Sequence, residues 1–136
     1  PVANREHDEL HDMIGLFVNM LVMRIRINNR MPFLELLNHV KKVTIEAYRH
    51  ASVPFEKIVD ALNIERDTSR PPLAQVVFNF QNTPHTKLKL ANLETTSIPI
   101  HNGSAKFEIT LDLVYNEDGI AGFVEYAKEL FSENYI

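Results

Sequence analysis

The sequence predicts an α/β fold, a mixed β-sheet flanked by helices, from two periodicities along its 136 residues. Apolar side chains recur at helical spacing between residues 32 and 62, and they alternate with polar side chains in stretches before and after that region. The last two such stretches are joined by a tight turn, which is typical of an antiparallel hairpin. The length suits one domain, and a composition of 45% apolar and 24% charged residues is ordinary for a globular protein.

The first predicted element is a long strand at residues 16–27. Its first half is apolar on both faces, as in a central strand that is covered on both sides. Its second half alternates isoleucine with arginine. By the two-residue period, Asn19 shares a face with Phe17 and Leu21.

Two helices are predicted next. The first covers residues 32–50, with Pro32 at the first helical position and an apolar stripe made of Phe33, Leu36, Leu37, Val40, Thr44, Ala47 and Tyr48. The second begins at Pro54 and is predicted to bury Phe55, Ile58, Val59 and Leu62. Residues 64–72 should be irregular, because two successive prolines remove amide donors and clash with a preceding helical turn.

The remaining predicted elements are strands. They cover residues 73–81, one or two weaker strands within 87–100, and a hairpin of residues 106–115 and 120–127 around an Asn-Glu-Asp-Gly turn. Ser132 and Glu133 read as the start of a helix, yet the sequence stops at Ile136. We therefore expect the chain to be cut from a longer protein.

Composition argues against several classes of function. The absence of cysteine removes disulfides, thiolate metal sites and a cysteine nucleophile, and it suits a reducing cytoplasm. The net charge is −4 and no basic run alternates with aromatic residues, so nucleic acid is not an expected partner. The apolar run at residues 13–23 is too short to span a bilayer, so no membrane role is expected.

A metal site at His7 and His11 is the weakest of three candidate motifs. Histidines four apart on a helix share a face and can bind zinc, but the zincin pattern needs glutamate where Asp8 stands, together with a third ligand. A solvated turn is the favoured interpretation, and no metal is predicted.

Asn19 and the charged loop at residues 64–73 are each open to two interpretations. An amide among large apolar residues needs partners, so Asn19 either fixes a neighbouring backbone or faces a channel through which substrate amides pass. The loop is either solvated surface or a shaped, salt-bridged segment in which Asp67 and Ser69 bond local backbone donors. No nucleophile–base–acid set and no glycine-rich phosphate loop accompanies them.

Three segments together resemble the condensation domains of nonribosomal peptide synthetases. Residues 14–24, Ile-Gly-Leu-Phe-Val-Asn-Met-Leu-Val-Met-Arg, are similar to the motif I-G-x-F-V-N-T-x-x-x-R. Residues 50–56, His-Ala-Ser-Val-Pro-Phe-Glu, resemble H/N-Q-D-x-P-F-E, and residues 66–73 resemble R-D-x-S-R-x-P-L. The flanking segments agree, so the resemblance covers the chain, with departures at Met20 for threonine, Ala51-Ser52 for Gln-Asp and Ala74 for phenylalanine.

This resemblance implies that residues 1–136 are the C-terminal lobe of a condensation domain, truncated at both ends. Each lobe of such a domain is like chloramphenicol acetyltransferase, and a tunnel lies between the two lobes. The family's catalytic H-H-x-x-x-D-G motif belongs to the N-terminal lobe and is absent here. The chain alone is therefore expected to be inactive, and no residue in it is predicted to be catalytic.

The resemblance also implies partners and a role in antibiotic biosynthesis. Donor and acceptor peptidyl carrier proteins would bring substrates on phosphopantetheine arms, and the acceptor amine would attack the donor thioester. The N-terminal lobe and an adjacent adenylation domain are the other implied partners, and no cofactor is expected to bind directly. The implied location is the cytoplasm.

Site residues follow from the motifs. The substrate-tunnel set is Gly15, Phe17, Asn19 and Arg24. The set implied near the lobe interface is His50, Pro54, Phe55, Glu56, Arg66, Asp67, Ser69, Arg70 and Pro72. Asn19 would bind a substrate carbonyl and position it, whereas His50 would order the turn before the second helix.

Two alternatives remain beside this hypothesis. One is a catalytically inactive docking module of the same fold, which a degraded H-H-x-x-x-D-G motif upstream would favour. The other is a lobe of a coenzyme A-dependent acyltransferase, which would not be expected to carry the R-D-x-S-R-x-P-L segment.

Overall fold

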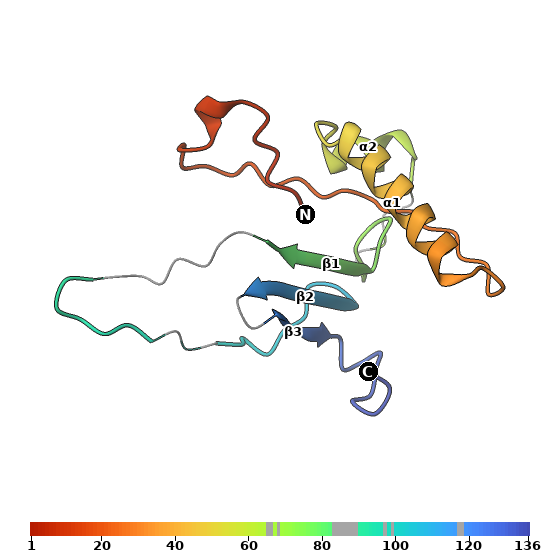
Figure 1. The fold of residues 1–136 in the computed structure, drawn as a ribbon. Coiled ribbons are helices and arrows are strands. Elements are labelled where there is room, and N and C mark those ends of the chain that lie inside the picture. Colours follow the sequence, from red (N-terminus) through yellow and green to blue (C-terminus); the bar gives the residue numbers. More distant parts are fainter. Residues whose placement is uncertain (65–66, 68, 83–89, 97, 99, 117–118) are drawn as a thin grey trace. The chain divides into compact units, whose positions relative to one another are not determined.

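The computed structural model describes residues 1–64, 67, 69–82, 90–96, 98, 100–116 and 119–136. The chain divides into two compact units, residues 1–66 and 67–136 (Figure 1). The first unit holds the short 3-10 helix η1 (Asp8–Leu10) and the helices α1 (Phe33–Arg49) and α2 (Phe55–Ala61). The second holds the strands β1 (Val76–Gln81), β2 (Ile109–Asn116) and β3 (Gly119–Tyr126). Two helices and a mixed sheet confirm the predicted α and β elements, and the flanking of the sheet by helices stays a prediction.

Helix α1 begins one residue later than predicted. Pro32 has an extended backbone, with φ −60° and ψ 148°, and is the N-cap residue. Along the helix, Leu36 and Val40 are half-buried, but Phe33 is 78% exposed and Tyr48 is 55% exposed. The predicted stripe is therefore wider than the face that this unit covers.

Helix α2 follows Pro54, as predicted, and places Val59 inside with 8% exposure. The prediction that Leu62 is buried is wrong, because Leu62 is 58% exposed. It follows the last helical residue, and Asn63 then takes a left-handed conformation with φ 47°. A left-handed residue after a helix turns the chain away from the helical axis.

The prediction of a strand at residues 16–27 is wrong for the described part of the chain. The segment is extended (Figure 1), but its pairing is limited to one isolated bridge between Val2 and Asn19. The Val2 amide donates to the Asn19 carbonyl at 2.8 Å, and the Asn19 amide donates back at 3.0 Å. Alternation predicts a backbone that fits a pleated surface, whereas a strand also needs a neighbour along several residues.

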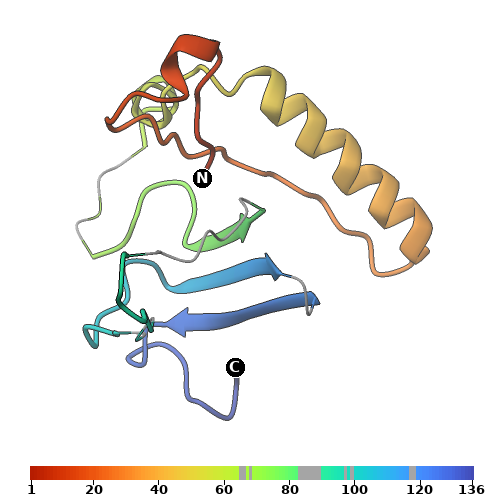
Figure 2. The same cartoon turned by 60° about the vertical axis from the view of Figure 1, so that its left-hand side comes forward.

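The sheet has the order β1-β2-β3, with β1 parallel to β2 and β2 antiparallel to β3. Figure 2 shows the long β2–β3 pair, in which Asn116 is opposite Gly119. The predicted hairpin is therefore confirmed, although β2 begins at Ile109 rather than at residue 106. The Gln75 carbonyl accepts from the amides of both Glu108 and Ile109, which marks where the ladder starts.

Two further predictions, the weak strands within 87–100 and the helix from Ser132, differ from the structure where it is described. The weaker strands predicted within 87–100 fall partly outside the described residues, and residues 90–96 hold one isolated bridge, Leu90 to Leu93. The helix predicted from Ser132 is a single turn, in which the Tyr135 amide donates to the Ser132 carbonyl at 2.9 Å. A turn of this length lacks the successive bonds that make helix growth favourable.

Each unit leaves apolar side chains exposed. Among the described residues, Val59 is the one apolar side chain that is buried. On the sheet, Phe78 lies in register with Leu111, which in turn faces Val124, and Phe78 is still 59% exposed. An apolar sheet face of this kind is normally covered by a further layer, and within its own unit this one is open.

Candidate functional site

Asn19 joins two of the three motif segments through its side-chain amide. Its Nδ2 donates to the carbonyl oxygens of Ala51 and Val53, each at 2.8 Å. Its Oδ1 accepts from the Phe55 amide at 3.2 Å and from the Met20 amide at 2.9 Å. Residues 14–24 and 50–56 are therefore one structural unit.

These four bonds use the whole hydrogen-bonding capacity of the amide, which is two donors and two acceptor lone pairs. The interpretation that Asn19 fixes a neighbouring backbone describes the observed geometry. The role in binding a substrate carbonyl stays a prediction, and it would require one of the four bonds to be released. Ala51 takes part through its backbone carbonyl, so its departure from the family's glutamine leaves this contact intact.

The turn that Asn19 holds connects α1 to α2. The His50 amide donates to the Ala47 carbonyl at 3.1 Å, and the His50 carbonyl accepts from the Val53 amide at 3.1 Å. The His50 imidazole is 3.6 Å from a Glu46 carboxylate oxygen and is 71% exposed. The His50 backbone thus takes part in the turn, and a role of its side chain in ordering the turn stays a prediction. Pro54 is the N-cap residue of α2, and Glu56 lies in the first turn of that helix, where the helix dipole favours an acidic side chain.

Arg5 organises the segment before Asn19. Its guanidinium donates to the carbonyl oxygens of Leu10, His11 and Met13, with distances of 3.3 Å to His11 and 2.9 Å to Met13. The guanidinium carbon also lies 4.2 Å from the centre of the Phe17 ring, a cation–π contact. The Arg5 side chain therefore fixes both the path of residues 10–13 and one face of Phe17.

Gly15 lies against the edge of the same ring. A Cβ atom added at Gly15 would be 2.9 Å from Phe17 Cε2, which is closer than carbon atoms pack. Glycine at this position therefore lets the backbone approach the ring that Arg5 covers. Of the other predicted tunnel residues, Arg24 is exposed.

We expect Gly15→Ala to displace the Phe17 ring. The clash and the weakened contact with Arg5 should lower the free energy of unfolding by about 1 kcal/mol. Chemical denaturation and the NMR shifts of the Phe17 ring protons measure the two effects. In a Phe17→Leu background the penalty should disappear; a penalty of equal size in both backgrounds would mean that the ring is not its cause.

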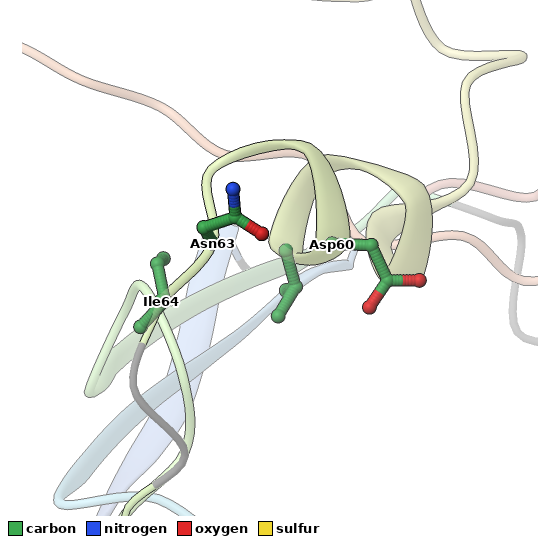
Figure 3. A pocket seen from close by; sticks show the side chains of 4 residues that line it. Asp60, Asn63 and Ile64 are labelled. Atoms are coloured by element: carbon green, nitrogen blue, oxygen red, sulfur yellow. The ribbon is translucent and has the colours of Figure 1, made fainter.

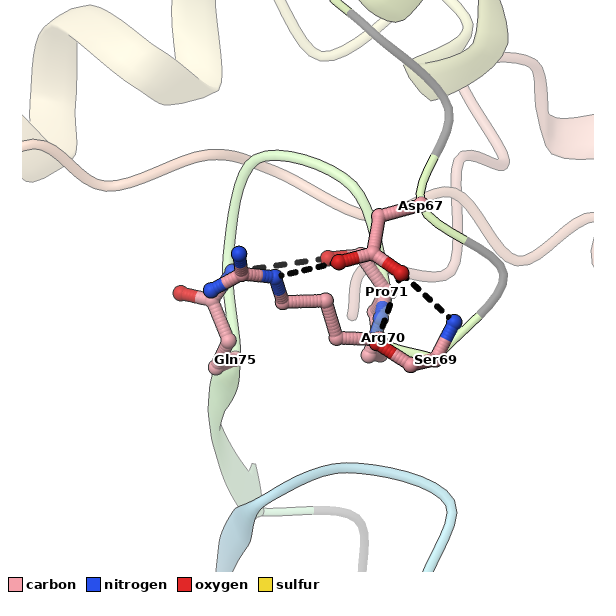
Figure 4. Close-up of polar contacts among 5 residues, drawn as sticks. All are labelled: Asp67, Ser69, Arg70, Pro71 and Gln75. Carbon is pink, nitrogen blue, oxygen red and sulfur yellow. Dashed lines mark hydrogen bonds and ion pairs between the residues drawn. The ribbon is translucent and has the colours of Figure 1, made fainter.

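The loop after residue 66 is shaped by Asp67 (Figure 4). Its Oδ1 accepts from the Ser69 amide at 2.9 Å and from the Ser69 hydroxyl at 2.6 Å, while Oδ2 lies 3.0 Å from Arg70 Nε. The Gln75 side chain donates to the Pro71 carbonyl at 3.4 Å. The shaped, salt-bridged interpretation is confirmed for these residues, and Arg66 lies outside the described residues.

The turn into β1 carries an unusual backbone. The Ala74 amide donates to the Pro72 carbonyl at 2.8 Å, and Leu73 between them has φ 65°. A bond between residues two apart around a left-handed centre is the rarer, strained form of γ-turn. It redirects the chain from the two prolines into β1.

The Asp67 carboxyl gives the loop a pH dependence. Hydrogen bonds from the Ser69 hydroxyl and amide, then from Arg70, hold the pKa of Asp67 below its ordinary value. Because the pKa is lowered in the folded loop, the ionised contacts are complete above the ordinary aspartate pKa and are lost as pH falls through the lowered one.

We therefore expect the NMR chemical shift of the Ser69 amide to change as Asp67 is protonated between neutral and acid pH. The midpoint of this change should lie below that of an unstructured aspartate. Ser69→Ala should move the midpoint, now followed at the amide of residue 69 in the variant, upward toward the ordinary value. An unchanged midpoint in that variant would contradict the assigned cause.

The second unit has polar pairs beside its sheet. Asn79 on β1 donates to the Asp112 carboxylate on β2, its partner in register. His101 Nε2 lies 3.0 Å from a Glu125 carboxylate oxygen, and His101 Nδ1 accepts from the Gly103 amide at 3.0 Å. Both ring nitrogens of His101 therefore have hydrogen-bond partners within this unit.

A depression of about 320 Å³ lies at the end of α2 (Figure 3). It is lined by Val59, Asp60, Asn63 and Ile64, and Figure 3 shows Asp60 and Ile64 diverging from one another. None of these four residues belongs to the predicted site sets. The described residues contain no group of three histidine, aspartate or glutamate side chains that could hold a metal ion, and no helix among them is long and apolar enough to cross a membrane.

Sequence reasoning missed Arg5, Asn79 and Gly122. Arg5 is the one arginine or lysine among the first 23 residues, which is the signal that could have singled it out. A glycine inside a strand pattern indicates close backbone approach, and a Cβ at Gly122 would be 2.0 Å from the Asp112 carbonyl oxygen.

Comparison with known proteins identifies the family. The condensation-domain model matches residues 1–136. The chain is 39% identical over 138 residues to a dimodular nonribosomal peptide synthase of Bacillus subtilis (strain 168), covering 96% of this chain and 6% of that protein. It is 34% identical over 133 residues to gramicidin S synthase 2 of Brevibacillus brevis, covering 98% of this chain and 3% of that protein. The chain thus spans a few per cent of the length of these relatives.

Solved structures agree with this result. The crystal structure of the X-domain from teicoplanin biosynthesis is similar with a TM-score of 0.81 and 29% identity, over 93% of this chain and 30% of that one. The X-domain in complex with OxyB is similar with a TM-score of 0.77 and 29% identity, over 94% of this chain and 29% of that one. With the three motifs in order and the family model matched from the first residue to the last, the chain belongs to the condensation domains of nonribosomal peptide synthetases.

Proposed function

We propose that this chain is the C-terminal lobe of a condensation domain that joins aminoacyl or peptidyl groups tethered to carrier proteins. The acceptor amine attacks the donor thioester carbonyl, an amide bond forms, and the thiol of the donor phosphopantetheine arm leaves. The lobe contributes one wall of the substrate tunnel and part of a carrier-docking surface. The base is supplied by the H-H-x-x-x-D-G motif of the other lobe.

The observation that carries the proposal is the hydrogen-bonded unit around Asn19. It brings two family motifs, 32 to 36 residues apart in sequence, into one scaffold. Such a scaffold gives a tunnel wall a fixed shape, and a fixed wall favours reaction by holding two tethered substrates in a productive geometry. Asn19 acts here by holding the wall in position rather than by transferring a proton.

The test compares the chain alone with the complete condensation domain of its parent protein. Each is mixed with donor and acceptor aminoacyl carriers, and dipeptidyl carrier is measured by mass spectrometry. Product should form with the complete domain and not with the chain alone. Product from the chain alone would contradict the division of roles between the lobes, and a complete domain that makes no product would contradict the condensation function.

A docking module is the second candidate function, favoured by the likeness to an X-domain that forms a complex with OxyB. In that case the complete domain would bind another enzyme of the assembly line without forming a peptide bond. The parent sequence discriminates the two: an intact H-H-x-x-x-D-G motif favours condensation, and a degraded one favours docking. The coenzyme A alternative gains no support from the two relatives compared with this chain, which are peptide synthetases.

A further inference from the structure

We propose that Arg5 is a positioning residue for the condensation reaction, acting through Phe17. The inference rests on the proposed function, because Phe17 is taken to lie on the tunnel wall. Arg5 contributes no chemistry of its own. Its guanidinium holds the ring of Phe17, and the backbone that leads to it, in one place.

The contacts of Arg5 suit this role. A guanidinium is planar and carries five N–H donors, so it can bind several carbonyl oxygens in its plane while an aromatic ring stacks on its face. Arg5 does both at once, with Leu10, His11 and Met13 around it and the Phe17 ring centre 4.2 Å away.

The backbone segment that contains Arg5 and Phe17 is also closed by hydrogen bonds between its two ends. Val2 and Asn19 form a reciprocal pair of hydrogen bonds at 2.8 and 3.0 Å, so residues 2–19 make a loop with Arg5 inside it. A Cβ atom at Gly15 would be 2.9 Å from the edge of the Phe17 ring, so there is no room for a side chain between them. Phe17 is therefore confined by Arg5, by Gly15 and by the anchored residue Asn19 two positions later.

Two substitutions at Arg5 distinguish the effect of its charge from the effect of its planar set of donors. Arg5→Met keeps an apolar stem and removes every donor, whereas Arg5→Lys keeps the charge but cannot present a planar fork. We expect Arg5→Met to lower kcat of the full-length synthetase by about tenfold or more, because small misplacements of a positioning group are costly. KM for the loaded carriers should change less than about twofold, and Arg5→Lys should recover part of kcat.

A double-mutant cycle with Phe17→Leu tests the path of action. If Arg5 acts through Phe17, the loss in kcat from Arg5→Met should shrink to less than about twofold in the Phe17→Leu background. Additive losses would overturn the proposal, and so would a normal kcat in Arg5→Met. Arg30→Met, which removes an exposed arginine outside the loop, is the matched control and should behave as wild type.

The positioning role of Arg5 can still be tested if a variant folds poorly or if the reaction is not condensation. If Arg5→Met does not fold, Arg5→Lys carries the same cycle. If the wild-type synthetase forms no peptide bond, the proposed function fails, and the NMR shifts of the Phe17 ring protons then test Arg5 separately. Ring shifts that are identical in Arg5→Lys and wild type would overturn the positioning role.

Discussion

Replacing Asn19 by alanine is expected to lower the free energy of unfolding of the condensation domain by about 2 kcal/mol, because buried or half-buried polar groups that lose a partner are costly. The substitution leaves the carbonyls of Ala51 and Val53 and the amide of Phe55 without their shared partner. Chemical denaturation measures the loss, and hydrogen exchange at the Phe55 amide should become faster. Peptide-bond formation should fall with it, because two motif segments are no longer joined.

Two variants control this result. Asn38→Ala removes an exposed asparagine from α1 and should leave stability and activity unchanged. Asn19→Asp keeps an acceptor for the Phe55 amide but puts a carboxylate oxygen against two carbonyl oxygens, so it should be as damaging as Asn19→Ala. An Asn19→Asp variant with wild-type stability would mean that the two donor bonds contribute little.

Replacing Gly122 by alanine should have the largest effect in the second unit. The new Cβ would lie 2.0 Å from the Asp112 carbonyl oxygen and 2.8 Å from Leu113 Cδ2. The strand that carries Asp112 is bonded on both sides, to β1 and β3, so it cannot move away without breaking a ladder. We expect a loss of about 3 kcal/mol or more in unfolding free energy, with poor recovery of folded protein.

The neighbouring position gives the control. Ala121 is exposed and faces Val114 in register, and Ala121→Val adds bulk where there is room, with a residue that suits a strand. It should be close to neutral by thermal unfolding. Equal losses in the two variants would show that β3 tolerates no added side chain anywhere, rather than that Gly122 permits one close approach.

The elements that the sequence predicts well are those encoded by neighbouring residues. Helix α1 follows from helical spacing and Pro32, and the β2–β3 hairpin follows from alternation and a turn signal. Both are present within one to three residues of the expected bounds. The prediction of a strand at residues 16–27 is wrong because a strand depends on residues far away in the sequence. A ladder depends on a partner far away in sequence, and alternation says nothing of where that partner is.

In the candidate site, too, contacts between neighbouring residues could be predicted and contacts between distant residues could not. The motifs pointed to Asn19 and to residues 50–56 separately, but only coordinates show that one binds the backbone of the other. Their contacts run through main-chain atoms of Ala51, Val53 and Phe55, whose side chains give no sign of them. The bonds within residues 67–70 could be predicted, because aspartate and serine two residues apart commonly bond local amides.

The role of Asn19 as a scaffold is tested by the exchange of its side-chain amide protons in the condensation domain, followed by NMR with and without a bound thioester analogue. Both Nδ2 protons should exchange slowly in the free domain, with no further change when the analogue binds, because Ala51 and Val53 already accept them. Fast exchange in the free domain that becomes slow only with the analogue would contradict this role and would assign Asn19 to the substrate.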